Sequence, residues 1–152
     1  MASPPFHRPI DAPPSAVYRA LLEADAAGRW RAPEGMSSTV HEFDGRPSRR
    51  FRISLTYRDQ PGRGKTTDRT DTFHGYFSQL VPDREVVEVI EFETTDPDLV
   101  AEFTVTTTLE ATDGGTRVTV VFEGLPPGVP ADDNVEGTRM GPARLATLVE
   151  GR

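Results

Sequence analysis

The sequence predicts an α+β fold in which a curved antiparallel sheet of about six to seven strands packs around a long C-terminal helix. Three observations lead to this prediction. Apolar and polar residues alternate along several segments, as expected of strands with one buried face. Asp113-Gly114-Gly115 is a strong hairpin signal, because such turns need residues that tolerate positive φ. Asp132 is a suitable N-cap for a final helix.

The N-terminal part predicts one strand followed by two short helices. Residues 6–10 look like the strand. A helix is expected to open at residues 12–15, since proline suits the first helical turn, and Val17 and Leu21 give it an apolar stripe. A second helix is expected over residues 25–30, broken by Gly28 or ended near Pro33.

Six further strands follow in the predicted order. Strands are expected over residues 37–43, 49–58, 70–77, 85–93, 103–110 and 118–122. Gly75 inside the third of these indicates a bulge or a close backbone approach. The apolar face of the second is formed by Phe51, Ile53, Leu55 and Tyr57.

The final helix is predicted to be kinked or interrupted at Gly141-Pro142. A proline inside a helix removes a hydrogen bond and clashes with the preceding turn, at a cost of about 3 kcal/mol or more. The better-anchored half is therefore expected at residues 143–150, with Leu145, Leu148 and Val149 as apolar anchors.

Composition narrows the function classes. A chain of 152 residues fits a single domain, residues 1–152, and its net charge of −7 argues against a nucleic-acid partner. No apolar run is long enough to span a membrane, and no secretory signal is visible, so a cytoplasmic location is the expectation. The absence of cysteine excludes disulfides, thiolate metal sites and a cysteine nucleophile.

A local excess of arginine contrasts with the acidic whole. Arg50, Arg52 and Arg58 are expected on one face of their strand, opposite Phe51. The favoured interpretation is a solvated outer sheet face balanced by acidic residues of neighbouring strands. A patch for an anion or an acidic partner is the alternative.

Glu88 and His74 are the candidates for chemistry. Glu88 shares a face with Ile90 and so is expected to point inward, where it could act as an acid or hold the polar end of a ligand. An ion pair with Arg52 or Arg69 is the equal alternative, and the opposite strand phase would bring Glu91 inward instead. The phase of His74, opposite Phe73, favours the solvent face over a role as general base.

No catalytic or metal constellation is predicted. Asp68, Asp71 and His74 are spaced three apart, and in a strand this spacing points to opposite faces. Ser54 and Ser78 have no adjacent grouping of a histidine with an acid, so a hydrolase triad is unsupported. No cofactor is expected.

Short motifs in a characteristic order carry a resemblance that spans nearly the whole chain. These pieces are Ala12-Pro13, Trp30, Asp44 with Arg46, Gly75-Tyr76-Phe77, Pro82, Glu88, Gly114-Gly115-Thr116, Leu125-Pro126, Gly137 and Leu145-Ala146. In this order the chain resembles the helix-grip (SRPBCC) superfamily of START domains, pollen-allergen proteins and polyketide cyclases. Within it, the chain is similar to homologues of the heat-shock-protein-90 ATPase activator. The resemblance implies a cavity between sheet and closing helix.

Two departures from the family pattern affect this cavity. The family often places a glycine pair where this chain has Ser48-Arg49. Its closing helix often carries a tryptophan and, four residues later, a leucine, where this chain has Thr138 and Pro142. The loss of two bulky anchors predicts a larger or more open pocket, with a volume above about 300 Å3.

The expected function is binding of a small hydrophobic ligand, as a carrier or sensor. Alternatives are a chaperone-regulating or other protein-interaction module, and a cyclase- or hydrolase-type enzyme that uses a pocket acid. A homodimer through a sheet edge or the kinked helix stays open. The residues expected to line the cavity are Trp30, Phe51, Ile53, Tyr57, Phe73, Phe77, Glu88, Ile90, Phe103, Val105, Thr138 and Pro142.

Overall fold

The computed structural model describes residues 6–31, 36–57, 70–94, 97, 101–124 and 143–150. Its seven-stranded antiparallel sheet has the order β1-β7-β6-β5-β4-β3-β2, so the predicted fold class is confirmed. The strands are β1 (Phe6–Ile10), β2 (Met36–Phe43), β3 (Arg50–Tyr57), β4 (Thr70–Val81), β5 (Glu85–Phe92), β6 (Phe103–Thr112) and β7 (Gly115–Glu123).

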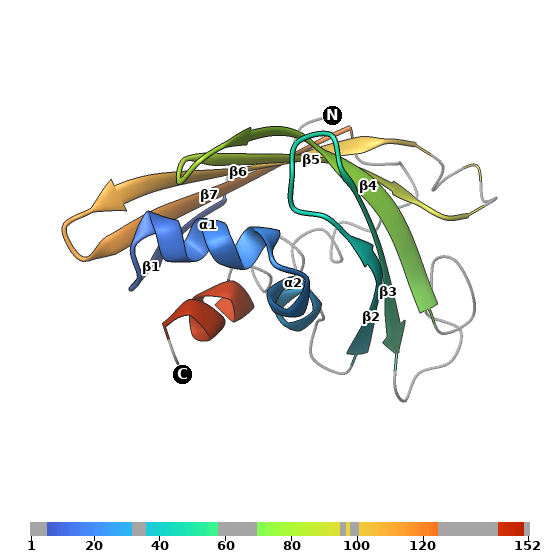
Figure 1. Cartoon of the computed structure of the whole chain (residues 1–152), viewed down its shortest axis with the longest axis horizontal. Coiled ribbons are helices and arrows are strands. Elements are labelled where there is room, and N and C mark those ends of the chain that lie inside the picture. Colours follow the sequence, from blue (N-terminus) through green and yellow to red (C-terminus); the bar gives the residue numbers. More distant parts are fainter. Residues whose placement is uncertain are drawn as a thin grey trace.

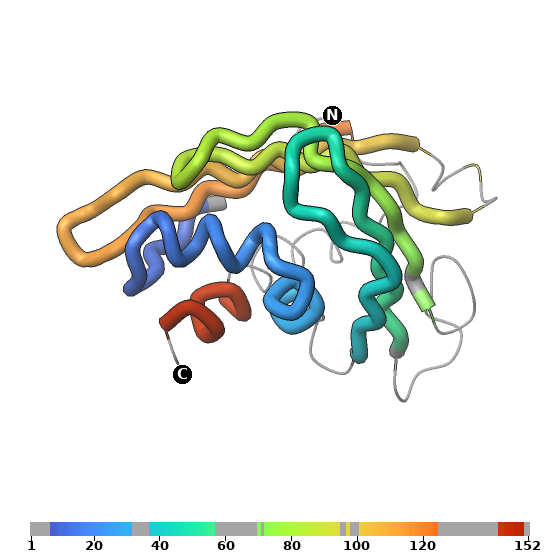
Figure 2. The backbone as a smooth tube through the Cα atoms, in the orientation of Figure 1, coloured from blue at the N-terminus to red at the C-terminus, as the bar shows by residue number. Residues whose placement is uncertain are grey.

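The sheet arches over the helices, which all lie on its concave side (Figure 1). Helix α1 (Pro14–Leu22) and helix α2 (Ala24–Trp30) connect the edge strand β1 to the opposite edge strand β2. A C-terminal helical segment, residues 143–149, lies beside them (Figure 2). From β2 to β7 each strand pairs with its successor, and β1 closes the order by pairing with β7.

The core fills the space between the concave face and the helices. On β6 the side chains of Phe103, Val105 and Leu109 are buried, and exposed or half-buried residues alternate with them. This alternation is why the strands were visible in the sequence, since burial of each large apolar side chain contributes about 1.5–3 kcal/mol. The C-terminal segment adds Leu145 and Ala146 to the same core, so the predicted anchored half of the final helix is confirmed.

Helix α1 begins where its prolines predict and presents one face to the core. Pro14 occupies the first turn, and the buried residues Val17, Ala20 and Leu21 follow a helical spacing. Helix α2 continues through Gly28, which therefore does not break it. Gly28 instead lies against β2, where Ser38 Oγ donates a hydrogen bond to its carbonyl oxygen.

Gly75 allows β4 and β5 to approach closely, as one of its two predicted roles requires. A Cβ atom at this position would clash with the carbonyl oxygen of Val89 and lie 2.8 Å from the ring of Phe51. The register shift between β4 and β5 falls further along, between Phe77 and Gln79. The predicted interruption at Gly141-Pro142 and the N-cap Asp132 lie outside the described residues.

The Asp113-Gly114 turn joins β6 to β7, with Thr112 paired to Gly115, and confirms the predicted hairpin. Of the helices that the structure describes, none has the length and hydropathy needed to cross a membrane.

Candidate functional site in the concave interior

Four phenylalanine rings form the apolar centre of the concave face. They come from β2, β3 and β4, so three neighbouring strands build one continuous aromatic surface. The ring centroids of Phe51 and Phe77 are 5.2 Å apart, and those of Phe43 and Phe77 are 5.7 Å apart. The rings of Phe73 and Phe51 pack edge to face, with their centroids 6.4 Å apart. We call these four residues the phenylalanine cluster.

A buried ion pair lies beside this cluster. Glu88 points inward from β5, between Phe77 of β4 and Val105 of β6 in the strand register. Its carboxylate accepts a hydrogen bond from the guanidinium of Arg31, and the side chains of Arg31 and Glu88 are 8% and 3% exposed. Burial of two charges is costly, and a buried ion pair is therefore weak evidence for stabilisation.

The last turn of α2 positions Arg31. The Arg31 backbone N–H donates to the carbonyl oxygen of Ala27 at 3.1 Å and so ends the helix. Its guanidinium carbon then lies 4.6 Å from the ring centre of Trp30 and 5.3 Å from that of Phe51. Both rings attract the cation through their electron-rich faces. The Nε–H of Arg31 is buried without a hydrogen-bond partner.

Trp30 links three elements at this point. Its indole N–H donates to the carbonyl oxygen of Ala20 in α1 at 3.3 Å. Its own carbonyl oxygen accepts from Arg144 Nε of the C-terminal segment at 2.8 Å. The end of α2 is thus held by both other helical segments, and this fixes the direction from which Arg31 enters the interior.

A further arginine enters the concave side from the sheet edge. Arg8 of β1 pairs in register with Val118, whose side chain is buried in the core. Residues directly opposite on antiparallel strands point to the same face. The Nε atom of Arg8 is buried without a hydrogen-bond partner. Arg8 and Arg31 thus each place a buried guanidinium nitrogen without a hydrogen-bond partner on this side.

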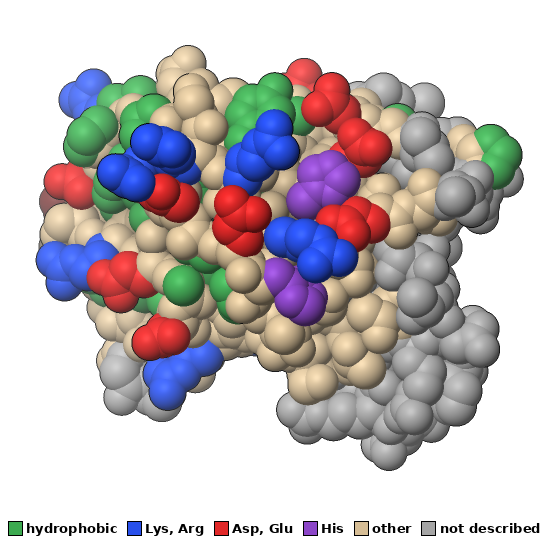
Figure 3. Space-filling view, turned by 45° about the vertical axis from the view of Figure 1, so that its right-hand side comes forward, with side chains coloured by type: hydrophobic (Ala, Val, Ile, Leu, Met, Phe, Trp, Pro, Cys, Tyr) green, Lys and Arg blue, Asp and Glu red, His purple; other side chains and the backbone are tan. Residues whose placement is uncertain are grey.

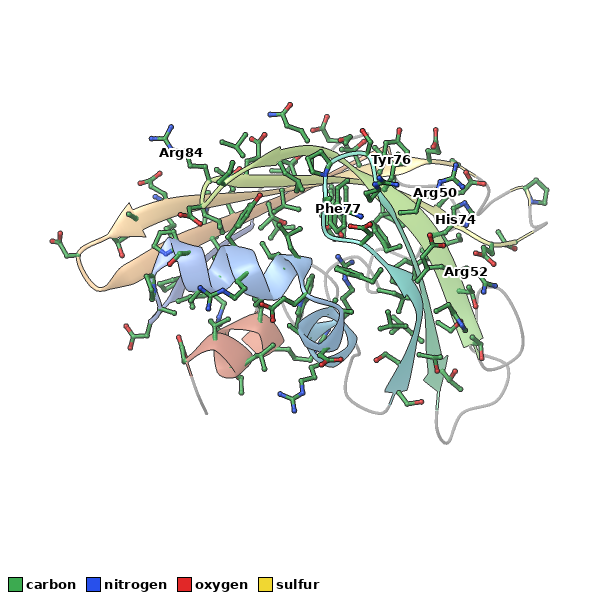
Figure 4. All side chains as sticks on the ribbon, in the orientation of Figure 1. Arg50, Arg52, His74, Tyr76, Phe77 and Arg84 are labelled. Atoms are coloured by element: carbon green, nitrogen blue, oxygen red, sulfur yellow. The ribbon has the colours of Figure 1, made fainter. Side chains whose placement is uncertain are left out.

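The convex face carries a separate ionic cluster, formed by Arg52, His74 and Glu93. Arg52 donates to both carboxylate oxygens of Glu93, at 2.7 and 2.9 Å, and His74 Nδ1 lies 3.0 Å from Glu93 Oε2. The hydrogen bond from Arg52 lowers the pKa of Glu93, and His74 adds to this effect. Figure 4 shows His74, Arg50, Arg52 and Tyr76 pointing away from the concave interior, whereas Phe77 points into it.

These contacts settle two sequence-based predictions. His74 lies on the solvent face, so it is not a general base of the interior. The outer face is balanced by acidic residues across the strands, since Glu93 neutralises Arg52. Figure 3 shows basic, acidic and histidine side chains interspersed on this face. Arg58 lies outside the described residues.

A polar contact that sequence reasoning missed also lies on the convex side. His41 Nε2 is 2.8 Å from Ser54 Oγ, which is 2.8 Å from Thr72 Oγ1. His41 alternates with Val40 in β2 and so points to the convex side, whereas the register shift between Val40 and Glu42 pairs Glu42 with Arg52. Within the described part of the chain, no group of three or more acidic, histidine or cysteine side chains is arranged to hold a metal.

Glu88, not Glu91, faces the interior, as the preferred strand phase predicts. The structure confirms an arginine partner for Glu88, but Arg52, one of the two arginines named, is not that partner. Arg52 lies on the opposite face of the sheet and binds Glu93, whereas Arg31 reaches Glu88 from the helical layer. Neighbouring strands were the obvious source of a partner, but a long side chain at the end of α2 supplies it. Arg69 lies outside the described residues.

Most residues that were expected to line a cavity lie together on the concave face. Eight of them are buried there: Phe51, Ile53, Phe73, Phe77, Glu88, Ile90, Phe103 and Val105. Trp30 is half-buried at the end of α2, and Tyr57 ends β3. Thr138 and Pro142 lie outside the described residues. That all of these residues line a ligand cavity stays a prediction.

A groove of about 240 Å3 lies on the helical layer. It is formed by α1, α2 and the C-terminal segment, and its walls include Ala16, Arg19, Ala26 and Leu148. This groove is distinct from the hollow predicted between sheet and closing helix. The segment 125–142, which the resemblance places over that hollow, is outside the described residues.

A concave antiparallel sheet, two helices between its edge strands and a C-terminal helix over the core define the helix-grip class of START-like proteins. The family model described as Activator of Hsp90 ATPase homolog 1-like protein matches residues 11–150, and the chain belongs to this family. The comparison with curated proteins gives no match.

Solved structures share this architecture over nearly the whole chain. Protein CV1439 from Chromobacterium violaceum is 28% identical, with a TM-score of 0.86 and coverage of 98% of this chain and 96% of that chain. A protein from Rhodobacter sphaeroides is 17% identical, with a TM-score of 0.77 and coverage of 99% and 98%. An AHSA1-like protein from Aeromonas hydrophila is 19% identical, with a TM-score of 0.73 and coverage of 99% and 93%.

Proposed function

We propose that this protein binds a small, largely apolar molecule between the concave face of the sheet and the C-terminal helix, as a carrier or sensor. Ligand sites of this kind are lined mainly by apolar and aromatic side chains, with a few placed polar groups that orient the ligand. The phenylalanine cluster with the buried Arg31–Glu88 pair beside it has this composition.

The observation that carries the proposal is the ion pair itself. A well-packed apolar pair at these positions would often be equally or more stabilising, because desolvation offsets the attraction between buried charges. Maintaining Arg31 and Glu88 inside an aromatic interior is therefore better explained by recognition than by stability. Perturbed or buried charged groups in such surroundings are recurrent markers of binding sites.

Identification of a co-purifying molecule tests the proposal. Native mass spectrometry of the purified protein should show an added mass that is released on denaturation and extracted into organic solvent. Val105→Phe, which adds volume on the concave face of β6, should reduce the bound fraction. Thr104→Phe places the same ring on the convex face of the same strand and should leave it unchanged.

Two results would contradict the proposal. One is a wild-type protein that carries no added mass and whose melting temperature no apolar compound raises. The other is an equal loss of ligand in the Val105→Phe and Thr104→Phe variants, since that would place the ligand elsewhere. Circular dichroism of both variants confirms that they are folded.

The family description favours a second candidate, a regulator of an ATP-dependent chaperone of the heat-shock-protein-90 type. This function predicts that the purified protein binds such a chaperone and changes its ATPase rate. An unchanged ATPase rate at saturating concentrations of this protein would contradict it.

A further inference from the structure

We propose that the ligand of the concave interior carries a carboxylate or a comparable oxyanion, and that Arg31 is the group that binds it. This inference rests on the proposed function and specifies the chemical class of the ligand. It starts from a donor that the fold buries and leaves unused, the Nε–H of Arg31.

Two arginine–glutamate pairs among the described residues, Arg52–Glu93 and Arg31–Glu88, differ in the number of guanidinium nitrogens that bind the carboxylate. On the convex face Arg52 donates hydrogen bonds from both Nε and Nη2 to Glu93, which is the bidentate geometry that arginine–carboxylate pairs favour. In the interior Arg31 gives only Nη2 to Glu88. The Nε–H of Arg31 therefore has no hydrogen-bond partner, although a buried donor without a partner costs about 1–3 kcal/mol of folding free energy.

The surroundings of Arg31 restrict what can complete this edge. The rings of Trp30 and Phe51 lie over the guanidinium, so a partner reaches it in the plane of its N–H groups. A planar oxyanion attached to an apolar body would satisfy the unpaired Nε–H and place its apolar part against the neighbouring phenylalanine cluster. Arginine is the side chain best suited to this form of recognition.

The test compares decanoate with decanol, which share an apolar chain and differ in charge. Isothermal titration to the wild-type protein should show decanoate binding roughly tenfold to a hundredfold more tightly, the range expected for a hydrogen bond to a charged group.

Variants locate the effect. Arg31→Met should abolish the preference for decanoate while decanol still binds. Arg52→Met is the matched control, because it removes a guanidinium from the convex face. It should leave the preference unchanged. If Arg31→Met fails to fold by circular dichroism, the wild-type comparison of acid and alcohol decides alone.

The outcomes separate this inference from the function on which it rests. Binding of decanol with no preference for decanoate, or a preference that survives in folded Arg31→Met, would overturn the role of Arg31 and leave apolar binding intact. Failure of both compounds to bind, together with no co-purifying mass, would overturn the proposed function itself.

Discussion

Ser48 adopts a backbone angle that residues with side chains rarely hold. Its φ is 65°, in the left-handed region, and its N–H donates to the carbonyl oxygen of Phe77 at 2.8 Å. This hydrogen bond joins the β2–β3 turn to β4 and holds Ser48 in place. The related family often has glycine at this point, and the observed angle gives the physical reason, because glycine lacks the Cβ atom that makes the region unfavourable.

Ser48→Gly should stabilise the protein. Relief of the left-handed conformation is worth about 1–2 kcal/mol, and the greater freedom of glycine in the unfolded chain offsets about 0.5–1 kcal/mol of this. We expect a net gain of up to about 1 kcal/mol in the free energy of unfolding, measured by urea denaturation. Ser48→Ala is the control and should give no gain. A destabilised Ser48→Gly variant would show that the serine side chain matters more than the backbone angle.

At the scale of elements, the helical layer is attached to the sheet by polar as well as apolar contacts. The end of α2 reaches β5 through Arg31 and Glu88, and it reaches the C-terminal segment through Trp30 and Arg144. These contacts fix how the helices lie over the phenylalanine cluster. The Arg31–Glu88 pair therefore also helps to attach the helical layer to the sheet.

Removal of one member of this pair should be far more harmful than removal of both. Glu88→Leu leaves the guanidinium of Arg31 buried without its charge partner, which typically costs about 3–5 kcal/mol. The double variant Arg31→Met with Glu88→Leu should recover most of this loss, because no uncompensated charge remains. Urea unfolding of the single and double variants measures the difference. Equal destabilisation of the two would mean that Arg31 is solvated when Glu88 is absent.

The cluster of Arg52, His74 and Glu93 links β3, β4 and β5 on the convex face and should make stability depend on pH. Because the pKa of Glu93 is lowered in the folded state, the unfolded chain binds more protons under acid conditions. The contribution is therefore fully present above the ordinary value of 4.5 and is lost as pH falls through the lower folded pKa. Arg52 is 45% exposed, so solvent screening keeps the contribution below about 1 kcal/mol.

Arg52→Gln should flatten this acid dependence. Melting temperatures of the wild type and the variant should converge below the folded pKa of Glu93 and differ above 4.5. High salt should reduce the difference, because it screens exposed charges. A gap between wild type and variant that stays constant from acid to neutral pH would assign the effect of Arg52 to packing.

At the scale of the whole molecule, the sequence predicts the strands of the sheet better than it predicts the contacts of the candidate site. Alternating residues such as Phe103 and Val105 predict which strands exist and which face is buried, because burial imposes a period of two. The inward direction of Glu88 follows from the same period. Its partner does not, since Arg31 follows a short helix and no pattern relates that position to β5.

The contact between His41 and Ser54 could not be predicted from the sequence for a related reason. The period of two predicts that His41 and Ser54 point to the convex side, but the strand register that brings them into contact is set by the assembled sheet. Periodicity thus predicts the faces of strands, whereas contacts made by long side chains between layers require the assembled fold.

The most direct test of the central claim uses the two faces of β5 as each other's control. Val86 and Ile90 point to the concave interior, and Val87 and Val89 point to the convex side of the same strand. Methyl NMR during titration with decanol should shift the signals of Ile90 and Val86 and leave those of Val87 and Val89 in place. Shifts confined to Val87 and Val89 would place the ligand on the convex face and contradict the account.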